Sequence, residues 1–104
     1  MRKAFICPTK YVQGEDELLN LGYFIASYGK SALLIAHQDD AARVADKLKA
    51  TQDKFGVTIV QSPFKGECSR QEIERLRGVG KDNGCDCIVG LGGGKAIDTA
   101  KCVA

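Results

Sequence analysis

The sequence predicts an α/β fold in which a parallel sheet carries helices on its faces. Short apolar runs of strand length alternate along the chain with amphipathic stretches of helix length, an order typical of this class. The apolar runs are nearly continuous, as in strands that are buried on both faces of a sheet. With 104 residues, the chain is long enough for one domain around one core.

The first third of the chain predicts two short extended segments and one helix. The segments 3–7 and 11–13 flank the break at Pro8. A helix is expected over residues 15–28, because apolar or small residues recur there at helical spacing, and Gly29 is a suitable C-terminal cap. The residues of that shared face are Leu18, Leu21, Gly22 and Ile25.

The middle third predicts two buried strands separated by a second helix. Residues 31–36 and 57–60 are apolar runs bounded by polar residues, which suits parallel strands. Between them, residues 39–54 have helical spacing, with a stripe that continues to Phe55 and an end at Gly56. The expected stripe consists of Ala41, Val44, Ala45 and Leu48.

A loop, a third helix and a third strand follow. Residues 61–68 form the loop, and Ser69 with Glu72 three positions later is a capping box that starts the helix. The helix is expected to break at the Asn–Gly pair that ends with Gly84, and residues 85–91 form the strand. The inward face of the helix consists of Ile73, Leu76 and Val79.

A fourth helix is expected to begin at about Lys95 and to cover residues 96–104. Its last residues, Cys102 to Ala104, lack a glycine cap or a polar ending and have the composition of a helix interior. We therefore expect a piece of a longer protein, truncated after the glycine-rich segment and its helix.

Composition and charge limit the classes of function. The net charge of +2 is nearly balanced and gives no basis for binding nucleic acid or a membrane surface. No apolar run approaches the ~18 residues needed to span a bilayer. The five cysteines are irregularly spaced and do not form a disulfide framework, so we expect a cytoplasmic protein.

Three consecutive glycines, Gly92 to Gly94, lie between the third strand and the fourth helix. Glycine permits positive φ and close approach of the backbone to a ligand, and the first turn of a helix offers unpaired N–H groups. Such a place favours phosphate and lies at the carboxyl end of a strand, so the sequence predicts a phosphate-binding loop. A tight turn between packed elements is the alternative explanation.

Neither of two common phosphate motifs fits this loop. A P-loop needs glycine five positions before the Gly–Lys pair and Ser or Thr after it, whereas Val89 and Ala96 stand at those places. A dinucleotide fingerprint that began at Gly90 would need glycine in place of Lys95. The loop is therefore of a third type.

Residues 92–101, GGGKAIDTAK, resemble the G-G-G-x-x-x-D-x-A-K signature of the iron-containing alcohol dehydrogenase superfamily. Further resemblance, to the glycerol dehydrogenase branch, covers essentially the whole chain. The segments that carry it are Pro8 with residues 10–14, residues 63–64 with 66–69, and residues 72–73 with 75–78.

The resemblance implies an N-terminal NAD-binding domain with a Rossmann-like three-layer fold, followed in the whole enzyme by a helical metal-binding domain. It implies oxidation of glycerol, a small polyol, to dihydroxyacetone with hydride transfer to NAD. It also implies a divalent metal, usually zinc, held by one Asp and two His beyond residue 104. The catalytic and metal-binding residues would all lie outside this chain, which alone would be inactive, and the whole enzyme would be a homo-oligomer.

Carried over position by position, the signature implies cofactor contacts along the glycine loop and the first turns of its helix. The lysine either pairs with a phosphate or is solvated beside a site built from backbone. The aspartate bonds a ribose hydroxyl, orients the loop, or only interacts with the helix dipole. The residues implied are Gly93, Gly94, Lys95, Ala96, Ile97 and Asp98.

One position departs from the pattern of the family, which usually has an Asp at the end of the second main strand to bind the adenosine ribose. Here that position is His37, and a neutral imidazole cannot bind a diol with two oxygens as a carboxylate does. Either His37 contacts the ribose, or Asp39 substitutes for it, or His37 is a partly exposed residue at a strand end. A protonated His37 would tolerate a 2′-phosphate, which leaves the choice between NAD and NADP open.

Cys85 and Cys87 form a C-x-C pair that would point to one face of a strand. No other Cys or His lies near them in the sequence, and the strand is otherwise apolar. We therefore expect small buried side chains rather than a metal or redox pair.

Two other functions fit parts of the pattern. A related metal-dependent dehydrogenase could act on another alcohol, a 1,2-diol, a hydroxy acid or glycerol 1-phosphate. A nucleotide-binding α/β module without catalysis would also use the glycine loop, although its sheet would have to be complete within 104 residues.

Overall fold

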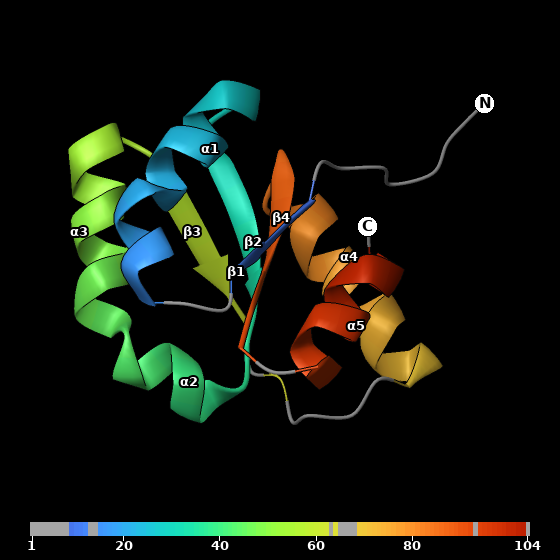
Figure 1. Cartoon of the computed structure of the whole chain (residues 1–104). Coiled ribbons are helices and arrows are strands. Elements are labelled where there is room, and N and C mark those ends of the chain that lie inside the picture. Colours follow the sequence, from blue (N-terminus) through green and yellow to red (C-terminus); the bar gives the residue numbers. More distant parts are fainter. Residues whose placement is uncertain (1–8, 13–14, 63, 65–68, 93, 104) are drawn as a thin grey trace.

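A four-stranded parallel sheet forms the centre of the computed structural model, which describes residues 9–12, 15–62, 64, 69–92 and 94–103. Within these ranges, the side chains of Glu15, Asp16, Lys95 and Ile97 are not described. The strand order is β1-β4-β2-β3, which confirms the predicted α/β class (Figure 1). The strands are β1 (Thr9–Val12), β2 (Ser31–Ile35), β3 (Thr58–Gln61) and β4 (Cys87–Leu91).

The last strand in the sequence lies inside the sheet. β4 pairs with β1, where Lys10 is opposite Val89, and with β2, where Leu33 is opposite Ile88. Every residue of β4 is buried, as expected for a strand covered on both faces. β3 pairs with β2 on the other side, with Ala32 opposite Ile59.

Helices cover both faces of the sheet and bury a separate apolar cluster on each (Figure 1). The 3₁₀ helix η1, α1 and α3 lie on one face over a cluster that includes Leu18, Ile25 and Leu48. On the other face, α4 and α5 cover a cluster that includes Leu76 and Ala100. The elements are η1 (Glu15–Asn20), α1 (Leu21–Tyr28), α2 (Gln38–Arg43), α3 (Ala45–Phe55), α4 (Arg70–Asp82) and α5 (Gly94–Val103).

Two predicted helices are each divided. Residues 15–28 begin as the 3₁₀ helix η1 and become α-helical at Leu21, although the predicted apolar face is buried throughout. The helix expected over 39–54 is interrupted at Val44, where φ is −110° and ψ is 16°. Because α3 restarts after this break, Ala45 is exposed rather than part of the buried stripe.

The other boundaries shift by a few residues. β4 begins at Cys87 instead of 85, and α5 begins at Gly94 instead of about Lys95. β1 covers Thr9–Val12, and residue 13, the predicted end of the second extended segment, lies outside the described residues. The strand expected at 3–7 and most of the loop at 61–68 lie outside the described residues. Such differences of one or two residues are usual at element ends.

Candidate functional site

The chain changes from one face of the sheet to the other where β2 and β4 end. The two strands are neighbours, with Ile35 paired to Gly90. After β2 the chain enters α2 and α3 on one face, and after β4 it enters α5 on the other. In open parallel sheets, ligands bind outside the strand ends at such a switch point. Residues 36–40, 92 and 94–98 lie at this place and are called the switch-point edge.

Gly92 forms the turn between β4 and α5. Its φ is +108°, a conformation that residues with a β-carbon rarely adopt. Its N–H donates to the carbonyl of Val12 at 3.1 Å, and α5 begins two residues later at Gly94. The first N–H groups of α5 thus lie at the carboxyl end of β4, as the sequence predicted. The predicted contact residue Gly93 lies outside the described residues.

The remaining residues of the signature form the first turns of α5. Ala96 is 5% exposed and packs in the apolar cluster beneath α4 and α5, so its side chain contributes packing and only its backbone can serve a ligand. Asp98 is exposed to solvent. Lys95 and Ile97 belong to the helix, but their side chains are among those not described.

His37 lies at the same edge, directly before α2. Its Nδ1 accepts a hydrogen bond from the backbone N–H of Asp39 at 3.2 Å, so the ring caps the helix and only Nε2 is left to contact a ligand. The side chain of His37 is 41% exposed and that of Asp39 is 85% exposed. His37 also forms an isolated parallel bridge with the buried Phe64, which follows β3.

Asp40 is the residue at this edge that the sequence did not single out. A β-carbon added to Gly92 would lie 2.8 Å from Oδ2 of Asp40, so the carboxylate occupies the space beside the glycine turn. The other oxygen, Oδ1, accepts a hydrogen bond from Nη1 of Arg43 at 2.9 Å. The only signal in the sequence was the position of Asp40, one helical turn after His37.

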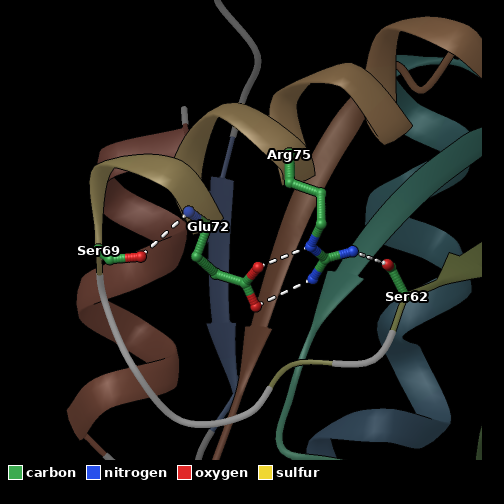
Figure 2. A network of polar contacts seen from close by, with 4 residues as sticks. All are labelled: Ser62, Ser69, Glu72 and Arg75. Atoms are coloured by element: carbon green, nitrogen blue, oxygen red, sulfur yellow. Dashed lines mark hydrogen bonds and ion pairs between the residues drawn. The ribbon is translucent and has the colours of Figure 1, made fainter.

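Polar contacts join the residue that follows β3 to the first turn of α4 (Figure 2). The hydroxyl of Ser69 accepts a hydrogen bond from the N–H of Glu72 at 3.1 Å, which confirms the first half of the predicted capping box. Arg75 donates to both carboxylate oxygens of Glu72, at 2.6 and 2.9 Å, and to the hydroxyl of Ser62 at 2.6 Å. One guanidinium group therefore joins the residue after β3 to the first turn of α4.

The contact with Glu72 also affects the ionisation of Arg75. The hydrogen bond to Glu72 and the attraction of its charge raise the pKa of Arg75, against the opposing effect of burial. The guanidinium remains charged under all ordinary conditions, so the arginine side of this contact does not change with pH.

A hollow of about 280 Å³ lies beside the switch-point edge, between β2, β3 and α2. Its lining is mostly apolar, with the side chains of Ala36 and Ala41, and includes the polar side chains of Gln38 and Ser62. The surface outside the ends of β2 and β3 is therefore concave on the side away from the glycine turn.

The two cysteines of the C-x-C pair lie in different cores, so the expectation that they share one face was wrong. Cys87 belongs to the cluster beneath α1 and α3, and Cys85 to the cluster beneath α4 and α5. The alternation of a strand does not extend to Cys85, because β4 begins only at Cys87. Burial raises the pKa of the Cys85 thiol, which a hydrogen bond from Ser31 partly opposes.

The described residues do not fit a metal site. Within the ranges that the structure covers, no group of three or more His, Cys, Asp or Glu side chains could hold a metal ion. In the same part of the chain, no helix has both the length and the apolar character needed to cross a membrane.

Known proteins match this chain along nearly its whole length. The sequence model of one family, described as iron-containing alcohol dehydrogenase, matches residues 8–104. Glycerol dehydrogenase from Pseudomonas putida is 40% identical over 104 residues, which is 100% of this chain and 28% of that protein. The chain thus spans little more than a quarter of the length of this relative.

Solved structures share the fold. The structure of glycerol dehydrogenase from Schizosaccharomyces pombe is 33% identical, with a TM-score of 0.72, and the match covers 98% of this chain and 26% of that one. NADH-dependent butanol dehydrogenase A from Thermotoga maritima is 25% identical, with a TM-score of 0.75, over 98% of this chain and 27% of that one. These matches agree with the three-layer α/β architecture of the described residues.

Proposed function

Because the chain belongs to the iron-containing alcohol dehydrogenase family, we propose that its switch-point edge binds the adenosine diphosphate part of NAD. The observation that carries this proposal is the glycine turn at Gly92, with φ of +108°, which precedes the N-terminus of α5. This turn lies at the ends of the neighbouring strands β2 and β4, and the chain leaves these two strands toward opposite faces of the sheet. Backbone N–H groups at a helix N-terminus bind phosphate, and the topology favours a dinucleotide at this place. The contacts are assigned to the backbone of residues 93–97, to Asp98 and to His37 before α2.

The whole protein that contains this chain is proposed to oxidise glycerol to dihydroxyacetone with NAD as the hydride acceptor. The support is the 40% identity to a glycerol dehydrogenase and the resemblance of the signature at residues 92–101. Such a reaction needs a group that polarises the alcohol oxygen, for which the resemblance implies a divalent metal, zinc in this branch. Its ligands are assigned to a part of the protein outside residues 1–104.

A substitution of Gly94 tests the phosphate contact. Gly94→Asp places a carboxylate in the first turn of α5, where the helix dipole stabilises it but where it repels a diphosphate. We expect NAD affinity, measured by isothermal titration, to fall at least ~10-fold, while Gly94→Ser, the uncharged control, changes it much less. Equal affinity of the wild type and Gly94→Asp would place the diphosphate elsewhere, and a wild type that binds no NAD would refute the proposal.

The activity itself is tested with the full-length protein. Oxidation rates with glycerol, a 1,2-diol, a hydroxy acid and butanol, each with NAD, identify the substrate class, and the metal content of the purified protein identifies zinc or iron. A chelator should abolish turnover; turnover that persists with the metal removed would overturn the metal-dependent reaction. Sedimentation of the same sample tests the proposed homo-oligomer, and cell fractionation tests the proposed cytoplasmic location.

A further inference from the structure

We propose that Asp40 is the residue that binds the adenosine ribose and sets the preference for NAD over NADP, in place of the carboxylate that the family usually carries at the position of His37. This inference rests on the proposed NAD site and adds a specificity-determining residue to it. It assigns the acidic side chain to α2, three residues beyond the expected position.

The geometry places the Asp40 carboxylate directly beside the glycine turn. Among the described residues, Oδ2 and Cγ of Asp40, at 2.8 and 3.6 Å, are the atoms that a β-carbon on Gly92 would meet within 4 Å. Asp40 follows β2 and Gly92 follows β4, and these strands are neighbours. The carboxylate thus lies between the two strand ends, where a dinucleotide lies on this type of sheet.

Arg43 fixes the direction of this carboxylate. Its guanidinium donates to Oδ1 of Asp40 at 2.9 Å, one turn further along α2. With Oδ1 held on the Arg43 side, Oδ2 is the oxygen directed at the glycine turn. The Asp40 side chain is 28% exposed, so it is accessible to a ligand but constrained by its neighbours.

His37 and Asp39, which also follow β2, are less suited to the ribose. Asp39 points to solvent, with a side chain that is 85% exposed and lies 3.5 Å from the ring of His37. The Nδ1 atom of His37 is engaged by the N–H of Asp39, which leaves one ring nitrogen for any ligand. A carboxylate oxygen has two lone pairs and can accept from both hydroxyls of a diol. The carboxylate of Asp40 is the one that lies beside the glycine turn, with Oδ2 available there.

The same carboxylate discriminates against a 2′-phosphate. A phosphate brought against Oδ2 would meet a like charge in a partly buried place, where repulsion is poorly screened. The guanidinium of Arg43 lies one turn further along α2, and without the charge of Asp40 beside it, its positive charge would attract that phosphate. Neutralising Asp40 should therefore lower the affinity for NAD and at the same time raise the affinity for NADP.

The experiment measures binding of NAD and NADP to the full-length protein and to three variants. Asp40→Asn removes the charge with little change of shape, Asp39→Asn is the matched control on the adjacent residue, and Asp40→Asn with Arg43→Ala tests the role of the arginine. We expect Asp40→Asn to weaken NAD binding ~10-fold and to strengthen NADP binding ~10-fold. The ratio of NAD to NADP affinity should therefore fall by about 100-fold. Asp39→Asn should leave the ratio within about twofold, and adding Arg43→Ala should remove the gain for NADP.

A second readout separates ligand contact from a structural role. The wild type should bind ADP about tenfold more tightly than 2′-deoxy-ADP, and Asp40→Asn should bind the two equally. A wild type that binds none of these nucleotides would refute the proposed NAD site. If the wild type binds NAD but Asp40→Asn, with an unchanged circular dichroism spectrum and melting temperature, keeps its NAD:NADP ratio, only the assignment to Asp40 fails.

Discussion

The hydroxyl of Thr51 accepts a hydrogen bond from the backbone N–H of Gly22 at 2.8 Å, across the interface between α3 and α1. The same hydroxyl donates to the carbonyl of Leu19 at 3.4 Å. Gly22 lies in the first turn of α1, whose N-terminal N–H groups have no partner within the helix, and Asn20 provides no side-chain cap. A threonine from another helix therefore caps α1.

Thr51→Val should lower the free energy of unfolding by about 1–3 kcal/mol, because it keeps the shape and leaves the buried N–H of Gly22 without its acceptor. Thr51 is 1% exposed, so water cannot easily replace the hydroxyl. Thr51→Ser, which retains the oxygen, is the control and should lose only the ~1 kcal/mol of a buried methyl group. Urea unfolding followed by circular dichroism measures both; a loss from Thr51→Ser as large as that from Thr51→Val would mean that the methyl group, not the hydroxyl, matters.

Gly22→Ala should destabilise the protein by about 1–3 kcal/mol, because the contact between α1 and α3 has no room for a methyl group. The new β-carbon would lie 2.7 Å from the carbonyl oxygen of Thr51 and 2.8 Å from the β-carbon of Phe55. Gly78→Ala in α4 is the matched control, since nothing lies within 4 Å of its added β-carbon. That variant should gain up to ~1 kcal/mol from helix propensity, and thermal melts of both variants should move in opposite directions.

Arg75→Lys should cost about 0.5–1 kcal/mol, because an ammonium group cannot reproduce the two-pronged contact with Glu72 while also reaching Ser62. Arg70→Lys, an exposed residue of the same helix, should change stability by less than ~0.5 kcal/mol. The difference between the two variants should shrink in 1 M NaCl, where charge interactions are screened. If it does not, the loss comes from packing rather than from the ion pair.

Cys102 should react with iodoacetamide in the folded protein well before Cys85 and Cys87. It is exposed, whereas the other two are buried, and burial raises the pKa of the Cys85 thiol, which lowers its thiolate fraction. Mass spectrometry of peptides after timed labelling at neutral pH gives the order in which the three cysteines react. Labelling in urea, where the protein is unfolded, should make their rates similar. Rapid modification of Cys85 in the native state would show that this core opens more easily than its burial indicates.

The raised pKa of Cys85 also predicts a pH dependence of stability. A group that binds its proton more tightly in the folded state stabilises that state at neutral pH. This contribution is lost as the pH rises above the ordinary value of 9.0 and through the higher pKa of the folded state. A Cys85→Ala variant should show a shallower fall of the unfolding free energy between neutral and alkaline pH than the wild type.

The sequence predicted the kind and order of the elements because periodicity is a local property. It did not predict the interruption at Val44, where neither glycine nor proline stands, nor the exposure of Ala45 that results from it. The predicted orientation of Cys85 was also wrong. β4 begins at Cys87 because its pairing with β2 begins there, where Ala32 lies opposite Cys87. Only the N–H of Asp86, which donates to the carbonyl of Ser31, precedes this pairing.

The candidate site was predicted in part. The glycine loop could be found from consecutive residues, and its place after β4 followed from the strand that precedes it. The approach of Asp40 to Gly92 could not be found in this way, because it depends on β2 and β4 being neighbours. That adjacency comes from the order β1-β4-β2-β3, which short-range patterns do not encode.

The place of β4 inside the sheet has a consequence for the order in which the protein folds. β1 is made first during translation, yet its neighbour in the sheet is β4, where Thr9 pairs with Ile88. β2 and β3 can pair earlier, because their paired residues, such as Ser31 and Thr58, are much closer along the chain. β1 must wait for β4 to emerge from the ribosome, and such late, long-range closure of a parallel sheet is slow and leaves apolar strand edges exposed to aggregation in the meantime.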